Sequence, residues 1–166
     1  YRFKGVIPNV KGYSRMVSAF DWLFSANLAI KNPIVNFVEQ PLKAYSEENR
    51  FKLFSYDTGM LGALADLDPQ NILDYNYGIY KGYYAENFVA NEFVIDDARS
   101  DRLFAWKEGG SEVEFLKQYK NNVVPIEVKA GNNKRAKSIK IFAEKYKSPL
   151  RIILRADDFS IKDDSH

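Results

Sequence analysis

The chain has 166 residues, of which 46% are hydrophobic, 28% charged and 15% aromatic, and its net charge is +2. This length is enough to bury one core and is compatible with a small second lobe. Cys is absent and the only His is His166, which excludes disulfides, Cys/His zinc sites, thiol catalysis and any Ser-His or Cys-His mechanism. An enzyme of this composition has to use carboxylates, Lys, Tyr or a hard metal ion bound by oxygen atoms.

The sequence contains no run of 18 apolar residues and no signal peptide. We therefore expect a cytoplasmic chain that does not cross a membrane. Because the sequence begins with Tyr1 and not with Met, we also expect it to be a fragment of a longer protein.

Residues 1–66 predict a small lobe with a winged-helix-like order of elements. The expected elements are a helix over Ser14–Ile30 that Pro33 ends, strands at Ile34–Glu39 and Phe51–Tyr56, and a short helix over Gly59–Ala65. Asp57 and Thr58 are typical of a cap for the short helix. Residues 67–77 contain Pro69 and several Asn and Asp, and they predict a linker.

Residues 78–160 predict a second domain in the order helix, three strands, helix, strand. The expected elements are a helix over Gly82–Val94, strands at Leu103–Lys107, Glu112–Gln118 and Val123–Lys129, a helix over Lys137–Tyr146 and a buried strand at Leu150–Leu154. The pairs Gly109-Gly110 and Asn121-Asn122 predict turns between the strands. Because Pro125 cannot donate to a strand ladder, we expect it at a strand start or a bulge. Residues 161–166 are expected to form a disordered tail.

Glu127 and Lys129 form an acid–base pair in the run Pro125-Ile-Glu-Val-Lys129. Successive strand residues alternate faces, so both side chains project from one face while Ile126 and Val128 point into the core. An acid and a base fixed on a strand can hold a divalent metal and position a water or a phosphate. The alternative is an exposed strand pair with a solvated salt bridge.

Three further acidic residues are candidates for the same site. Glu112 and Glu114 lie on the preceding strand, and a hairpin would make Glu114 a neighbour of Glu127. Like charges opposite each other are unfavourable unless a cation lies between them, and Mg²⁺ binds one or two carboxylates. Glu86 lies on an otherwise apolar helix stripe, where a charge needs a partner or a metal. The alternatives are solvent-facing positions for Glu112 and Glu114, and a boundary position for Glu86 or a pair with Lys129.

Basic residues cluster after the Glu127 strand. Residues 129–151 contain eight Lys and Arg against one Glu, whereas residues 66–101 contain eight Asp and Glu against one Lys and one Arg. The candidate nucleic-acid-binding residues are Lys134, Arg135, Lys137 and Lys140, which would neutralise backbone phosphates. An ordinary solvated helix face is the alternative interpretation. The sequence contains neither of the glycine-rich phosphate-binding motifs, so we expect no nucleotide site here.

Three segments together resemble a known superfamily: Gly82-x-x-x-Glu86, Glu112-Val-Glu-Phe115 and Pro125-Ile-Glu-Val-Lys-Ala-Gly131. They are similar to the PD-(D/E)xK nuclease superfamily, whose core runs helix, three strands, helix, strand. More closely, the chain resembles the C-terminal domain of unknown function of bacterial and archaeal AAA+ ATPases, which carries a stretch similar to Lys52-Leu-Phe-Ser-Tyr-Asp-Thr-Gly-Met60.

The resemblance implies an α/β fold with a mixed sheet and a nuclease-like site. Glu114 and Glu127 would bind Mg²⁺ or Mn²⁺, Lys129 would assist the attacking water or the phosphate charge, and Glu86 would lie in the outer shell. The family usually has Asp at the position of Glu114, which points to a shifted or weakened site. The implied partners are DNA and an N-terminal ATPase domain that precedes Tyr1.

Two other functions are compatible with the sequence. In the first, the nuclease-like domain is inactive and docks DNA or protein partners to the ATPase, which the Glu at position 114 favours. In the second, the N-terminal lobe mediates homo-oligomerisation and the carboxylates are incidental. Fold alone does not decide among these functions.

Overall fold

The computed structural model describes residues 12–74, 77–97, 103–131, 136–156 and 160–161. Within these residues the fold is α/β, with one mixed six-stranded sheet and five α-helices. The helices are α1 (Val17–Ser25), α2 (Thr58–Leu64), α3 (Pro69–Leu73), α4 (Lys81–Asp97) and α5 (Lys137–Tyr146), and the strands are β1 (Ala29–Val35), β2 (Ser46–Ser55), β3 (Phe104–Glu108), β4 (Ser111–Tyr119), β5 (Asn122–Lys129) and β6 (Ile152–Arg155).

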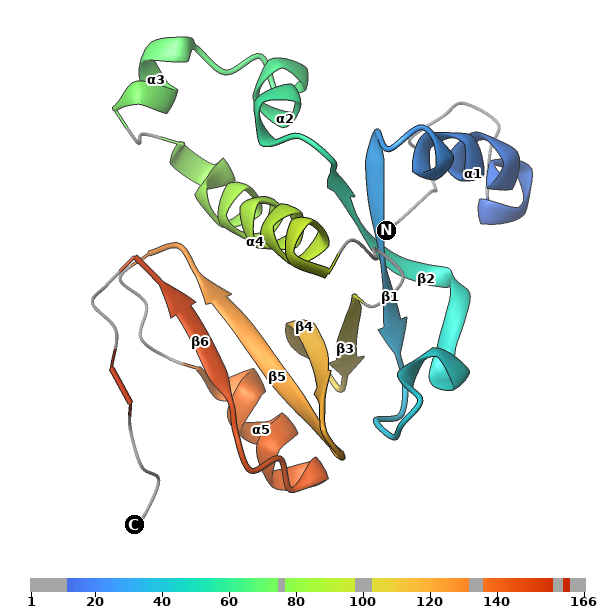
Figure 1. Ribbon diagram of the computed structural model, residues 1–166. Helices are drawn as coiled ribbons and strands as arrows, with labels where there is room; N and C mark the ends of the chain where they lie inside the picture. Colours follow the sequence, from blue (N-terminus) through green and yellow to red (C-terminus); the bar gives the residue numbers. More distant parts are fainter. Residues whose placement is uncertain (1–11, 75–76, 98–102, 132–135, 157–159, 162–166) are drawn as a thin grey trace.

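The strands follow the order β2-β1-β3-β4-β5-β6 across the sheet. Neighbours are antiparallel except at two places, where β1 pairs with β3 and β5 pairs with β6 in parallel. The two helices α4 and α5 lie on opposite faces of this sheet, α1 lies beside β1, and α2 and α3 lie on the side of α4 (Figure 1). A parallel connection needs a crossover, and α5 is the crossover from β5 to β6.

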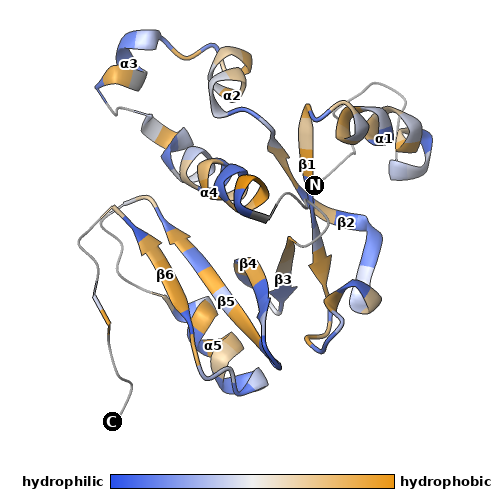
Figure 2. Ribbon diagram, in the orientation of Figure 1, coloured by the Kyte–Doolittle hydropathy of each residue, from blue (hydrophilic) through white to orange (hydrophobic). Residues whose placement is uncertain are grey.

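Two hydrophobic clusters fill the two faces of the sheet. On the α4 face, Ala90 and Val94 of the helix pack with Val124 and Ile126 of β5. On the α5 face, Phe142 packs with buried residues of β3 and β4 that include Trp106. The hydropathy colouring shows the corresponding apolar stretches on β5 and β6 (Figure 2). On β5, the neighbouring residues Val123 and Val124 belong to different clusters, as the side-chain period of two requires.

The expected order of elements in residues 78–160 is confirmed. The helix, three strands, helix and strand all form, and the helix over Lys137–Tyr146 has the predicted bounds. Gly109 and Gly110 both have positive φ, of 54° and 82°, in the turn between β3 and β4. The last strand, β6, is half-buried and lies at the sheet edge, so the expectation of a fully buried strand is wrong.

The end of the first helix differs from the prediction. α1 ends at Ser25 because Asn27 adopts the left-handed conformation, with φ of 54°. The N–H of Leu28 then donates to the carbonyl of Leu23 at 3.0 Å, which completes a Schellman-type C-cap. β1 therefore begins at Ala29 and contains Pro33, which the sequence analysis expected to end the helix.

Both sheet prolines lie one residue before a parallel ladder begins. Pro33 precedes Ile34, where β1 starts to pair with β3, and Pro125 precedes Ile126, where β5 starts to pair with β6. Each proline is therefore paired along one side only, opposite Phe51 or Leu116. This corrects the expectation for Pro125, which lies inside β5, away from its start and with no bulge in its ladder to β4. A missing N–H is tolerated where no neighbouring strand needs it.

The first part of the chain contributes to the same sheet as the second. β1 and β2 extend the sheet beside β3, so they do not form a separate sheet of their own. The short helix α2 has the predicted cap, since the N–H of Met60 donates to Asp57 Oδ1 at 2.7 Å. The expected linker contains the helix α3. Of the expected tail, residues 162–166 lie outside the described residues. The likeness to a winged helix stays a prediction.

Candidate functional site

Glu127 and Lys129 are together at the end of β5. Because Ile126 and Val128 pack in the cluster under α4, Glu127 and Lys129 project from the opposite face. Lys129 Nζ forms an ion pair with Glu127 Oε1. Glu127 is only 3% exposed, and its second oxygen, Oε2, is buried without a hydrogen-bond partner. One half of this buried carboxylate is therefore paired and the other half is unsatisfied, which is costly in a protein interior.

Glu114 lies beside this pair on β4. The last paired residues of the β4–β5 ladder are Phe115 and Ile126, and Glu114 and Glu127 come next along the two strands. Beyond this point the backbone N–H of Val128 donates to Glu114 Oε2, at 3.4 Å. The carboxylate of Glu114 thus takes the place of a backbone carbonyl where β4 and β5 stop pairing.

The pKa of Glu114 is raised from 4.5 to about 7, chiefly by burial. The negative charges of Glu86 and Glu127 also contribute to the rise, while its own backbone and Lys52 act in the opposite direction. A carboxyl surrounded by like charges in a partly buried position holds its proton more tightly. We call Glu114 and Glu127 the carboxylate pair. The predicted proximity of the two residues is supported by their neighbouring strand positions and by this mutual charge effect.

Glu86 and Glu112 belong to a second group of charges. Lys52 on β2 contacts both of them, at 2.6 Å from Glu86 and 3.0 Å from Glu112, and Lys107 contacts Glu112 at 2.6 Å. We call these two acids and two lysines the paired cluster. Its charges balance, and the two lysines lower the pKa of Glu112 despite its burial. Glu86 pairs with Lys52 and not with Lys129, and it influences Glu114 through its charge.

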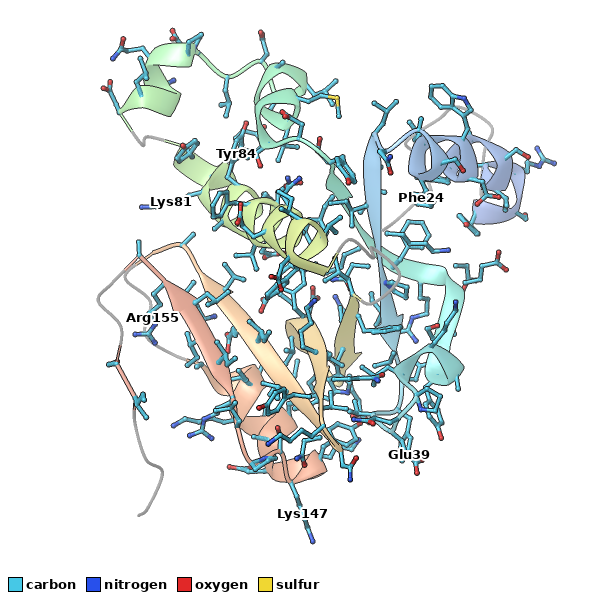
Figure 3. The ribbon with its side chains drawn as sticks, in the orientation of Figure 1. Phe24, Glu39, Lys81, Tyr84, Lys147 and Arg155 are labelled. Atoms are coloured by element: carbon cyan, nitrogen blue, oxygen red, sulfur yellow. The ribbon has the colours of Figure 1, made fainter. Side chains whose placement is uncertain are left out.

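The predicted nucleic-acid-binding residues are described in part. Lys137 and Lys140 are exposed on α5, which packs on the face of the sheet from which Glu127 and Lys129 project. Lys134 and Arg135 lie outside the described residues. Arg155, labelled at the end of β6 in Figure 3, is the register partner of Lys129 and adds a further positive residue at this end of β5.

The metal-binding potential of the site rests on two carboxylates. Among the described residues, no three acidic or His side chains are grouped closely enough to hold a metal ion together. A Mg²⁺ ion needs only one or two carboxylates, because waters and substrate oxygens complete its shell. The unsatisfied Oε2 of Glu127 and the raised pKa of Glu114 are both consistent with oxygen ligands for a cation, so the donor set fits Mg²⁺ or Mn²⁺.

A pocket of about 370 Å³ lies at the other end of β5. Its lining includes Glu39, Asn122 and Lys147, and Figure 3 shows Glu39 and Lys147 far from Arg155. The carboxylate pair is therefore not part of this pocket.

Two residues near the carboxylate pair, Asn32 and Lys52, were not predicted from the sequence. Asn32 on β1 is fully buried, and its Nδ2 donates to the backbone carbonyl of Glu114 at 3.0 Å. The available signal was a polar residue at the alternate position between Ile30 and Ile34, on an otherwise apolar face of the strand. Lys52 was noted only as part of the family-like stretch, and its partners come from elements more than thirty residues away in the chain.

The comparison with protein families gives one match. Residues 81–165 match the family described as Domain of unknown function (DUF4143), and the chain belongs to this family. The match begins at α4 and covers the carboxylate pair, Lys129 and α5, while β1 and β2 precede it. No curated protein and no solved structure matches the chain. None of the helices in the described part of the chain is long and apolar enough to cross a membrane.

Proposed function

We propose that the chain is the nuclease-like C-terminal part of an AAA+ ATPase, in which the carboxylate pair binds one Mg²⁺ or Mn²⁺ ion and acts on DNA phosphodiesters. The observation that carries this proposal is the buried, half-satisfied carboxylate of Glu127 beside a second carboxylate that holds its proton up to a pH of about 7. Two such groups side by side disfavour each other unless a cation neutralises them.

The order and pairing of the elements support a PD-(D/E)xK core. α4, β3, β4, β5, α5 and β6 follow the order of that superfamily, with β5 and β6 parallel. By the resemblance, Glu114, Glu127 and Lys129 would correspond to the superfamily's acidic and basic motif residues. These likenesses support the proposal without testing it, since one fold hosts many functions.

The residues of this site have separate roles in the proposed reaction. A divalent cation held by Glu114 and Glu127 would supply charge neutralisation and water activation. Lys129 would stabilise the charge that develops on the phosphate, and Glu127 Oε1 orients its ammonium through their ion pair. Glu86 is an outer residue that affects Glu114 by charge and is itself held by Lys52. Lys137 and Lys140 would bind the DNA backbone.

A second candidate function is an inactive nuclease-like module that docks DNA or protein partners to the ATPase. One observation favours it: among the described residues, no group of three acids is close enough to hold an ion. The family pattern of Asp in place of Glu114 favours it as well. An inactive module would bind DNA without cleaving it and would bind Mn²⁺ weakly.

The test is cleavage of a DNA substrate with Mg²⁺ or Mn²⁺ by the chain, compared with Lys129→Ala and Lys107→Ala. We expect Lys129→Ala to slow cleavage by about 10²–10³-fold, the usual loss when one charge-stabilising donor is removed. Lys107, an exposed member of the paired cluster, is the matched control and its loss should change the rate less than about twofold. Equal rates for the two variants would refute the assignment of Lys129.

Direct metal binding separates the two candidate functions. Titration with Mn²⁺ is expected to give saturable binding that Glu127→Gln abolishes. Weak Mn²⁺ binding without cleavage favours the docking module, and no binding at any Mn²⁺ concentration that keeps the chain folded contradicts the metal site itself.

A further inference from the structure

A β-bulge in β4 displaces Glu114 from regular strand pairing. β3 and β4 pair at Phe104 with Leu116 and at Trp106 with Val113, so that Glu114 and Phe115 together lie opposite the single residue Ala105. A bulge of this kind leaves one residue unpaired and changes the direction of its side chain. The ladder between β4 and β5 ends at the same place, after Phe115. The backbone carbonyl of Glu114 therefore needs a partner from outside β3 and β5.

Asn32 supplies that partner. It lies on β1, has no exposed surface, and donates through Nδ2 to the carbonyl of Glu114 at 3.0 Å. Only the amide NH₂ can face a carbonyl oxygen, which fixes the orientation of the side chain. The other atom, Oδ1, is buried without a hydrogen-bond partner. A fully buried amide with one unsatisfied atom destabilises the fold and calls for a reason beyond packing.

The contact with Asn32 links the backbone position of Glu114 to the position of its carboxylate. Asn32 holds the backbone of Glu114 at the bulge, and the carboxylate of Glu114 reaches the N–H of Val128 on β5. If the backbone turned at the bulge, the carboxylate would leave Val128 and change its position relative to Glu127. A strand that precedes the family-matched region thereby sets the geometry of a residue within it.

We propose that Asn32 is a positioning residue that fixes the carboxylate of Glu114 at the candidate metal site. The inference rests on the proposed function for its metal-binding consequence, whereas the placement of Glu114 against Val128 can be tested alone. Residues 81–165 then lack one part of the site, which β1 provides. Asn32 itself does not contact the reacting atoms.

The test compares Asn32→Ala with Asn87→Ala. Asn87 is a matched control because it is also a buried asparagine, 2% exposed, whose amide bonds a strand backbone, the N–H and carbonyl of Ser55 on β2 at 2.8 and 3.0 Å. Both variants lose a buried amide, so both lose stability, and only the first loses the contact to Glu114. The readouts are hydrogen exchange at the Val128 amide and the affinity for Mn²⁺.

We expect Asn32→Ala to speed exchange at Val128 by about tenfold relative to Asn87→Ala. We also expect it to weaken Mn²⁺ binding by about 10–100-fold, as the loss of outer-shell partners does, with Asn87→Ala near the original affinity. If Asn32→Ala does not fold, Asn32→Leu keeps a side chain of similar shape without a hydrogen-bond donor and serves in the same comparison.

Equal exchange at Val128 in the Asn32 and Asn87 variants would overturn the inference. Fast exchange with unchanged Mn²⁺ affinity would also overturn it, because Asn32 would then act on the backbone and not on the site. If the unsubstituted chain binds no Mn²⁺, the proposed function fails, and exchange at Val128 still decides whether Asn32 holds Glu114.

Discussion

The paired cluster and the carboxylate pair each contain two acids, yet they differ in charge balance. In the paired cluster Lys52 and Lys107 neutralise both acids, and Lys52 contacts both of them. The carboxylate pair has one lysine, Lys129, for two acids, one buried oxygen without a hydrogen bond and one raised pKa. Acidic residues near each other are therefore not equivalent candidates for a metal site, and the carboxylate pair, which Lys129 neutralises only in part, is the one that a cation would stabilise.

The largest effect on stability is expected from Lys52→Met, which keeps the aliphatic stem and removes the charge. Glu86 and Glu112 would remain as partly buried acids, with only Lys107 as a counter-charge, and removing one partner of a buried pair costs about 3 kcal/mol. Urea unfolding of the two proteins at neutral pH measures this loss. The control is Lys107→Met, whose side chain is 51% exposed and whose loss should cost at most about 1 kcal/mol.

Equal losses for the Lys52 and Lys107 variants would contradict this view of the paired cluster. Lys52 would then be an ordinary surface cation, and the balance of charges around Glu86 would not distinguish this cluster from the carboxylate pair.

The two groups should respond to pH with opposite signs. The pKa of Glu114 is raised to about 7, so its contribution to stability is complete below pH 4.5 and is lost as the pH rises through 7. The pKa of Glu112 is lowered, so its contribution is present above pH 4.5 and is lost as the pH falls below that value. For Glu114 the loss amounts to about 2 kcal/mol after allowance for partial exposure.

Urea unfolding of the metal-free chain, of Glu114→Gln and of Glu112→Gln across pH 4 to about 8 measures both contributions. The stability difference between the chain and Glu114→Gln should decrease with rising pH. The difference between the chain and Glu112→Gln should increase over the acidic part of the range. If both stability differences change with pH in the same direction, the two acids have similar surroundings.

Local patterns predicted the elements of residues 78–160 well because each pattern depends on the conformational preferences of residues that are close together in the sequence. The glycine pair at 109–110 requires a turn, and alternation along β5 places Ile126 in the core and Glu127 on the other face. The register that makes Glu114 and Glu127 neighbours follows from a short hairpin. The same local signals failed at Ile30, because the C-cap at Asn27 outweighed the helical spacing of the apolar residues.

Long-range partners could not be predicted from local patterns. Asn32 and Lys52 reach Glu114 and Glu86 only because β1 and β2 join the sheet beside β3, and a parallel pairing between distant segments leaves no mark in a short window of sequence. The bulge at Glu114 lies within the β3–β4 hairpin, and the alternation of residues along β4 does not predict it. The sequence thus identified the charged residues of the candidate site, but it did not predict which residues they contact.

The smallest effects are expected for the lysines of α5, which are the candidate contacts to DNA beside the carboxylate pair. We expect the exposed Lys137 and Lys140 to bind the phosphates of a DNA backbone that lies near the carboxylate pair. The double variant Lys137→Ala/Lys140→Ala should therefore bind DNA up to about tenfold more weakly at low salt. The slope of log K against log salt should decrease in magnitude by about two, one unit for each lysine. Stability should stay within about 0.5 kcal/mol because both side chains are exposed.

Lys145 is the control on the same helix, since it is already paired with Glu108, and Lys145→Ala should leave the slope nearly unchanged. If the double variant and Lys145→Ala have the same slope, α5 does not bind the DNA backbone. Any cation bound by the carboxylate pair would then be bound without DNA contacting this helix.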